Sequence, residues 1–116
     1  AASALGVRSY PASISAPSLA APTTEAAQWD AARKILSADA KARKADHAHC
    51  VATVRGRADL MQNYSIIVNK PKNIVAYIVC DRIQAAIISG RYSFEIHRAI
   101  ISGTSVPQFI RIIQGR

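Results

Sequence analysis

Large apolar side chains are distributed unevenly along this chain of 116 residues. From Cys50 onward the sequence is crowded with Ile, Val, Tyr and Phe, whereas the apolar residues of the first half are mainly alanines. A large side chain contributes about 1.5–3 kcal/mol when it is fully buried, and alanine contributes much less. One core usually takes about 100–150 residues, so we expect one domain whose hydrophobic body lies in residues 50–116.

Residues 1–23 differ from the rest in composition. Pro11, Pro17 and Pro22 are interspersed with Ser and Ala, and no apolar period of 2 or 3.6 residues holds across them. Proline at this spacing blocks both a helix and a central strand. We therefore expect an extended Pro/Ala/Ser arm, which could become ordered along a partner, followed by a single small domain over 24–116.

A helix is predicted over 24–47. Thr24 can cap its N-terminus, and Glu25 places negative charge in the first turn. The apolar stripe at helical spacing is Trp29, Ala32, Leu36 and Ala40, with Ile35 beside it. A second, polar line reads Asp30, Arg33, Ser37, Lys41 and Lys44. One face of the helix should pack, and the other should meet solvent or a polyanion.

Beyond this helix the sequence favours strands. Segments 50–57, 64–69 and 74–80 are rich in β-branched and aromatic residues, and Pro71 and Asn73 suit a turn between the last two. These patterns predict an α+β fold, in which the long N-terminal helix packs on a small, mainly antiparallel sheet.

The last third contains an internal repeat. Residues 83–90 match residues 96–103 at six of eight positions, and both copies end in Ile-Ile-Ser-Gly. Either each copy ends a short helix at its glycine, with Asp81 and Ser93 as N-caps, or the motif marks a strand that runs into a turn. We favour helix for 81–89 and a half-buried strand for 92–97, where large apolar and polar residues alternate.

Positive charge is the main functional signal. Fifteen Lys and Arg face seven Asp and Glu, for a net charge of +8 and a pI near 10.1. Such an excess attracts polyanions and acidic protein surfaces. The candidate contact residues, all within 41–72, are Lys41, Arg43, Lys44, Arg55, Arg57, Lys70 and Lys72.

These cations could form one surface that binds phosphates without reading sequence. Only Tyr64 and Tyr77 lie nearby, so stacking on single-stranded bases is poorly supported. We therefore expect a structural or assembly subunit, such as a linker, within a multi-subunit complex. Its partners would be acidic protein subunits or a nucleic-acid backbone, and it would need neither catalysis nor a cofactor.

The chain also contains residue types that bind zinc. His47, His49, Cys50 and Cys80 supply imidazoles and thiols, but no CxxC or HxxxH spacing is present. We expect no metal here, because histidines suit a helix C-terminus and cysteine packs as a small apolar residue. The sequence leaves open whether the two cysteines pair.

The alternative function is a small nuclease. Glu95 and His97 would share one face of the strand over 92–97, and nearby arginines could stabilise a phosphodiester transition state. A solvent-facing polar row is the commoner meaning of this pattern, and no P-loop or GxGxxG is present. Enzyme activity is therefore the minority hypothesis.

Two further expectations concern location. The longest apolar run, Ile74–Cys80, spans seven residues, whereas a membrane helix needs about 20. The first 24 residues are Ser/Ala-rich and carry Arg8 as their single cation. This composition suggests an organellar protein, in plastid or mitochondrion, after removal of a transit peptide. Simple methionine removal before a flexible tail explains it equally well.

Overall fold

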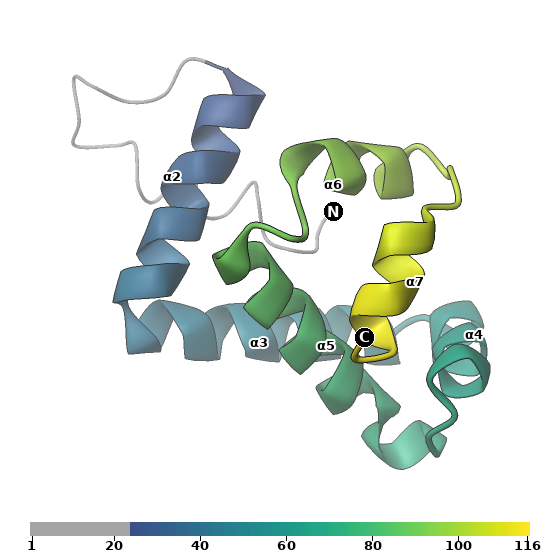
Figure 1. Cartoon of the computed structure of the whole chain (residues 1–116). Helices are drawn as coiled ribbons and strands as arrows, with labels where there is room; N and C mark the ends of the chain where they lie inside the picture. Colours follow the sequence, from purple (N-terminus) through teal and green to yellow (C-terminus); the bar gives the residue numbers. More distant parts are fainter. Residues whose placement is uncertain (1–23) are drawn as a thin grey trace.

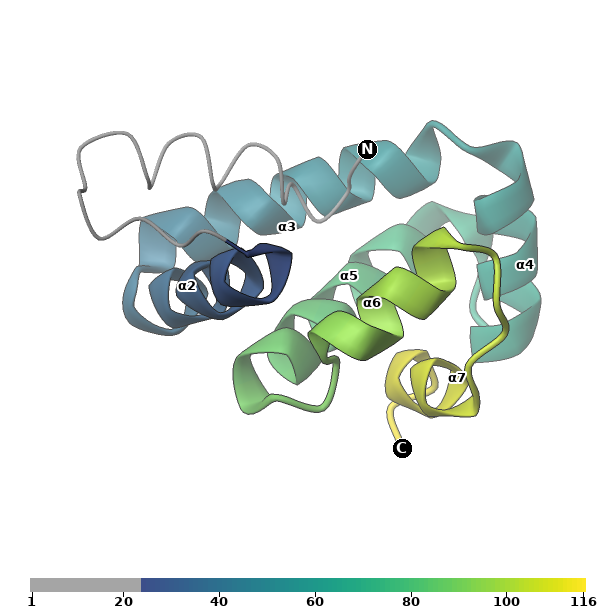
Figure 2. The same cartoon turned by 90° about the horizontal axis from the view of Figure 1, so that it is seen from above.

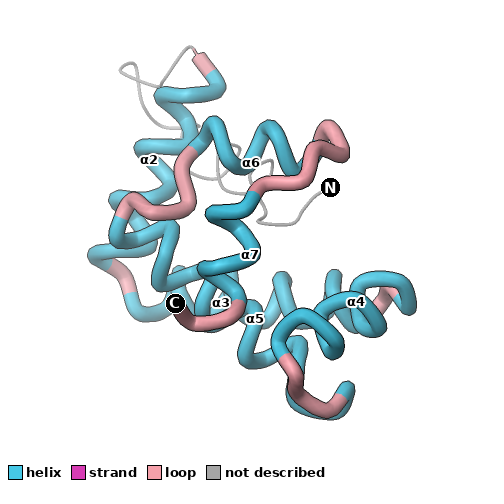
Figure 3. The backbone as a smooth tube through the Cα atoms, turned by 45° about the vertical axis from the view of Figure 1, so that its right-hand side comes forward, coloured by secondary structure: helices cyan, strands magenta, loops and turns pink. Residues whose placement is uncertain are grey.

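The computed structural model describes residues 24–116, and within that range it contains helices and no strand (Figure 3). The helices are α2 (Glu25–Ala38), α3 (Ala40–Arg55), α4 (Ala58–Val68), α5 (Lys72–Ser89), α6 (Phe94–Ile101) and α7 (Pro107–Ile113). The predicted α+β fold is therefore wrong: the fold is all-α, and no sheet exists in the described part of the chain for the first helix to pack on. The predicted arm over 1–23 lies outside the described residues.

Helix α5 forms the centre of the fold. Helix α3 lies along one side of it and α7 along another, while α2 and α4 contact opposite parts of α5 (Figures 1 and 2). Seven of its side chains are buried: Val75, Ala76, Val79, Cys80, Ile83, Ala86 and Ile87. A helix covered on so many sides has an almost continuously apolar sequence.

The predicted helix over 24–47 is two helices that meet at Asp39. This residue adopts an extended conformation, ends α2, and accepts hydrogen bonds from the backbone N–H groups of Lys41 and Ala42 at the start of α3. Aspartate is a strong N-cap because its side chain satisfies amides that have no partner within the helix. The predicted apolar stripe is buried at Trp29, Ala32 and Leu36, whereas Ala40 lies beyond the break and is exposed.

The three segments predicted as strands are helical. Residues 50–55 complete α3, residues 64–68 belong to α4, and residues 74–80 lie in α5. A short apolar run has the same composition in a buried strand and in a buried helix, so periodicity cannot separate them. β-branched residues favour burial as much as an extended backbone, and here α5 provides the burial.

The internal repeat marks the ends of two helices. Gly90 closes α5 and Gly103 follows α6, and both have φ of +88°. Glycine is favoured there because the left-handed conformation costs other residues about 1–2 kcal/mol. Residues 81–89 are helical as expected, but they form the second half of α5, so Asp81 lies within the helix and is not its N-cap. The strand expected over 92–97 is wrong, because Ser93 caps α6 and accepts a hydrogen bond from the Ile96 amide.

Candidate functional site

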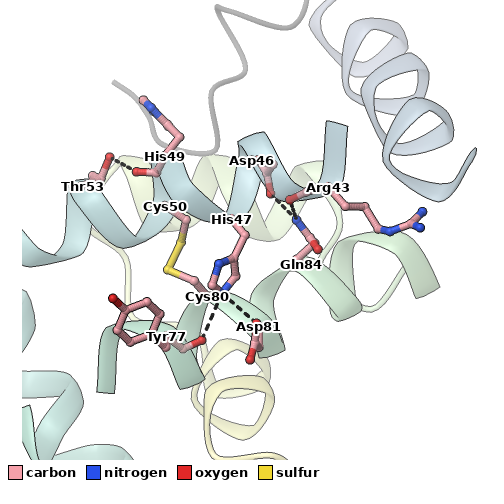
Figure 4. Close-up of a disulfide and its surroundings, with 10 residues drawn as sticks. All are labelled: Arg43, Asp46, His47, His49, Cys50, Thr53, Tyr77, Cys80, Asp81 and Gln84. Carbon is pink, nitrogen blue, oxygen red and sulfur yellow. Dashed lines mark hydrogen bonds and ion pairs between the residues drawn. A yellow bond between two sulfur atoms is a disulfide. The ribbon is translucent and has the colours of Figure 1, made fainter. Parts of the chain in front are cut away.

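Helices α3 and α5 are joined by a series of polar and covalent contacts, which we call the α3–α5 seam (Figure 4). The contacting pairs are Arg55 with Asn73, Cys50 with Cys80, His47 with Asp81, and Asp46 with Gln84. Residue numbers fall along α3 as they rise along α5, so the two helices run antiparallel. The seam holds residues 73–84 of α5 in a fixed register against α3.

A disulfide between Cys50 and Cys80 lies in the middle of the seam. Both cysteines are buried, and they pack in a small cluster with Val51, Val54 and Ala76. The sequence left this pairing open because it depends on the spatial distance between residues 30 positions apart. The structure therefore removes both thiols from the zinc-ligand set considered above.

His47 lies beside the disulfide and bridges the two helices. Its Nε2 is 2.7 Å from the Asp81 carboxylate and 3.4 Å from the backbone oxygen of Tyr77. Its ring is nearly parallel to that of Tyr77, with 6.2 Å between centroids. His49 points away from α5, as Figure 4 shows. The two histidines therefore do not face a common ligand.

A buried polar group lies at the other end of the seam. The Gln84 side-chain amide donates to Asp46 Oδ2 at 3.0 Å and to the Arg43 backbone oxygen at 2.8 Å. Asp46 is 2% exposed, and its Oδ1 makes no hydrogen bond. Because the carboxylate lies within the helix contact, it contributes to the register of α3 against α5 rather than to a binding surface.

Four of the predicted cations lie in or beside the turns at the two ends of α4, and the Arg55 side chain links the first turn to the start of α5. We call this group the basic corner: Arg55, Arg57, Lys70 and Lys72. The Arg55 guanidinium donates to the Asn73 backbone oxygen at 3.3 Å and lies over the Tyr77 ring, 4.5 Å from its centroid. These contacts place the C-terminus of α3 beside the N-terminus of α5.

The charges of the basic corner are only partly neutralised. Arg57 pairs with Asp59 through two hydrogen bonds of 3.2 and 2.6 Å, and this pairing lowers the pKa of the Asp59 carboxyl. Lys70 and Lys72 are exposed, and their ammonium groups contact no carboxylate within residues 24–116. Three of the four cations thus lack an acidic partner in this range.

The start of α5 adds to this positive potential. Its N-cap is Pro71, no side chain caps the helix, and its first turn contains no acidic residue. Unpaired amides at a helix N-terminus carry partial positive charge. The uncapped helix end and the two lysines therefore present charge of the same sign at one place.

The other three predicted cations lie elsewhere. Lys41 and Lys44 are exposed on the first half of α3, and Lys44 is separated from Arg55 by about 16 Å along the helix axis. Arg43 turns back to donate to the backbone oxygens of Leu36 and Ser37 at the end of α2, so it has a structural role. The seven cations form two groups rather than one continuous surface.

Sequence reasoning missed the residues that organise the basic corner. Tyr77 and Asn73 were placed in a predicted strand and turn, and they are the residues that hold Arg55. Their separation of four residues is one helical turn, so a helical interpretation of 72–89 would have placed both beside the same partner.

Glu95 and His97, the residues of the nuclease hypothesis, lie on different sides of α6. Glu95 is exposed, whereas His97 is buried beneath Trp29, with 4.7 Å between ring centroids. His97 Nδ1 is 3.2 Å from the Tyr92 hydroxyl, and burial lowers the pKa of His97 to about 4. Burial also raises the pKa of Tyr92. This arrangement resembles a packed aromatic core, because the imidazole faces other rings and not solvent.

Metal sites and membrane spans are two further possibilities for residues 24–116. No three His, Cys, Asp or Glu side chains in this range come together as metal ligands. None of the helices described combines the length and the apolar character needed to cross a bilayer.

Comparisons with protein-family models, with curated protein sequences and with solved structures find no match to this chain.

Proposed function

We propose that this protein is a non-catalytic binding module of a larger assembly, and that the basic corner is the surface that docks on a polyanionic partner. The observation that carries the proposal is the excess of exposed cations there. Four exposed basic side chains lie in or beside two turns, and only Arg57 among them pairs with a carboxylate, that of Asp59. A cluster with this charge attracts an anionic surface and speeds its association.

The fold supports binding rather than conformational change at this site. Arg55 is held by the Tyr77 ring and the Asn73 carbonyl, and the disulfide fixes α3 against α5 nearby. A cation that is already ordered loses little side-chain entropy when it meets an anion, so more of the interaction energy appears as affinity.

The proposal is tested with two matched double variants. Lys70→Gln with Lys72→Gln removes two charges from the basic corner, and Lys41→Gln with Lys44→Gln removes two charges from α3. The two variants have equal net charge, so any difference in the salt concentration at which they elute depends on where the removed lysines lie. Elution from heparin, a generic polyanion, is measured for both and for the wild type along a salt gradient.

We expect the corner variant to elute at a clearly lower salt concentration than the α3 variant. Removing one cation that pairs with an anionic group of the polyanion reduces the salt dependence of binding by about one unit of slope. Equal elution of the two variants would show that net charge, not the basic corner, controls retention. A wild-type protein that passes through heparin at low salt would overturn the proposal.

The assembly part of the proposal has its own test. Native material purified under low-salt conditions should migrate well above the size of a 12.5 kDa chain, because its partners remain bound. Raising the salt should release the chain. A single species at the size of the free chain under both conditions contradicts membership of a larger assembly.

A further inference from the structure

Exposed apolar side chains accompany the cations of the basic corner. Within residues 24–116 the large apolar side chains that are exposed are Ile66, Ile74, Tyr77 and Ile101. Ile66 lies on α4, and Ile74 and Tyr77 lie on the first half of α5, so three of the four belong to the elements that form the corner. Single exposed apolar residues are common, but their concentration beside a charged cluster is typical of an interface.

We propose that the partner of the basic corner is an acidic, amphipathic protein segment, in which carboxylates flank apolar side chains. This inference rests on the function proposed above and identifies the class of partner. The segment's carboxylates would meet Lys70, Lys72 and Arg55, while its apolar side chains would cover Ile74 and Tyr77.

Ile74 and Tyr77 lie close enough to Arg55 for one ligand to contact all three. Ile74 and Tyr77 are three residues apart on α5 and therefore lie on the same side of the helix. They are 38% and 44% exposed, and Arg55 covers part of the tyrosine ring. A ligand that reaches the guanidinium of Arg55 therefore also reaches apolar surface.

Arginine and tyrosine in contact are typical of the energetic centre of protein interfaces. Both residue types are enriched among the side chains whose truncation costs the most binding energy. Arg55 keeps guanidinium N–H groups beyond the one that donates to Asn73, and a carboxylate can accept two parallel hydrogen bonds from such a group. Arg55 and Tyr77 can therefore bind a carboxylate and an adjacent apolar side chain at the same time.

Nucleic acid fits these features less well. A phosphate backbone supplies anions but offers little aliphatic surface to cover Ile74. Single-stranded bases need a free aromatic face, and the Tyr77 ring already has the Arg55 guanidinium over one face. Between these two classes, a protein segment fits better because it can contact both the cations and the apolar side chains of Ile74 and Tyr77.

The test compares probes and variants by fluorescence anisotropy at physiological salt. The probes are a synthetic Glu-rich helix with Leu at helical spacing, polyglutamate of the same charge, a random 20-base-pair duplex, and phosphatidylserine vesicles measured by sedimentation. The variant Ile74→Gln removes apolar surface without changing charge, and it keeps Tyr77, which holds Arg55. Ile101→Gln is the control, because Ile101 is 71% exposed on α6. Circular dichroism confirms that each variant is folded.

We expect the amphipathic peptide to bind about tenfold more tightly than polyglutamate, and Ile74→Gln to lose much of that factor for the peptide alone. Ile101→Gln should bind like the wild type. Lys70→Gln with Lys72→Gln should weaken binding of every polyanion.

Several results would overturn the inference. Equal affinity for the peptide and polyglutamate would show that the apolar side chains contribute nothing. Tightest binding to the duplex or to the vesicles would identify a different partner class, and would leave the polyanion-binding function intact. Failure to bind any of the four probes, at physiological salt and again after the salt is lowered, would overturn that function itself.

Discussion

Loss of the Cys50–Cys80 disulfide should destabilise the protein strongly. The bond closes a loop between residues 30 positions apart, and the chain-entropy relation for such a loop gives about 3.5 kcal/mol of stabilisation. For a domain of this size, a loss of that magnitude lowers Tm by about 15–25 °C. The stabilisation arises mainly because the cross-link restricts the unfolded chain.

The measurement compares oxidised and reduced protein by thermal unfolding, followed by circular dichroism. Both sulfurs are buried, so the protein is reduced in denaturant and refolded with reductant present. Cys50→Ala with Cys80→Ala is the control, because its Tm should be low and should not respond to reductant. A change in Tm of less than about 5 °C on reduction of the wild type would refute the reasoning, because it would correspond to about 1 kcal/mol or less.

Three further changes test α6 and the end of α5 by urea unfolding. Burial lowers the pKa of His97 from 6.5 to about 4, so the unfolded chain takes up the proton first as pH falls. Stability should therefore decrease between about pH 6.5 and pH 4, by about 2.5 kcal/mol at pH 4.5, and His97→Gln should lack this component. Ser93→Ala removes the α6 N-cap and should cost about 1 kcal/mol, whereas an unchanged midpoint would show that the cap is dispensable. Gly90→Ala should cost about 1–2 kcal/mol from backbone strain alone, since φ is +88° and no atom crowds the position, and Gly90→Asn should cost less.

The first third of the described chain could be interpreted from sequence. The spacing of Trp29, Ala32 and Leu36 identified the buried face of α2, because a helical period is visible when one face alone is covered. The break at Asp39 was missed. Aspartate is both a tolerable surface residue within a helix and a strong N-cap, and the surroundings determine which role it takes.

The central part of the chain could not be interpreted in the same way. A helix that is buried on one side shows apolar residues at a spacing of about 3.6 residues. Helix α5 is covered by several neighbours, so its apolar residues are consecutive and this spacing is hidden. The run from 74 to 80 therefore resembled a buried strand. Its true length, from Lys72 to Ser89, separates the two possibilities because buried strands are short.

In the candidate site, too, some features could be predicted from the sequence and others required the structure. The seven cations and the net charge of +8 are properties of composition, so the sequence alone predicts that the protein attracts anions. Only the tertiary structure separated Arg43, which caps α2, from the basic corner and brought Arg55 beside Asn73 and Tyr77.

The pairing of Cys50 with Cys80 was likewise decided in three dimensions. The charge and the helical spacing of apolar residues in one segment can be obtained from the sequence without knowledge of the fold. Contacts between α3 and α5 depend on how two helices pack, and that packing is determined by the burial of α5 as a whole, which no short segment of sequence specifies.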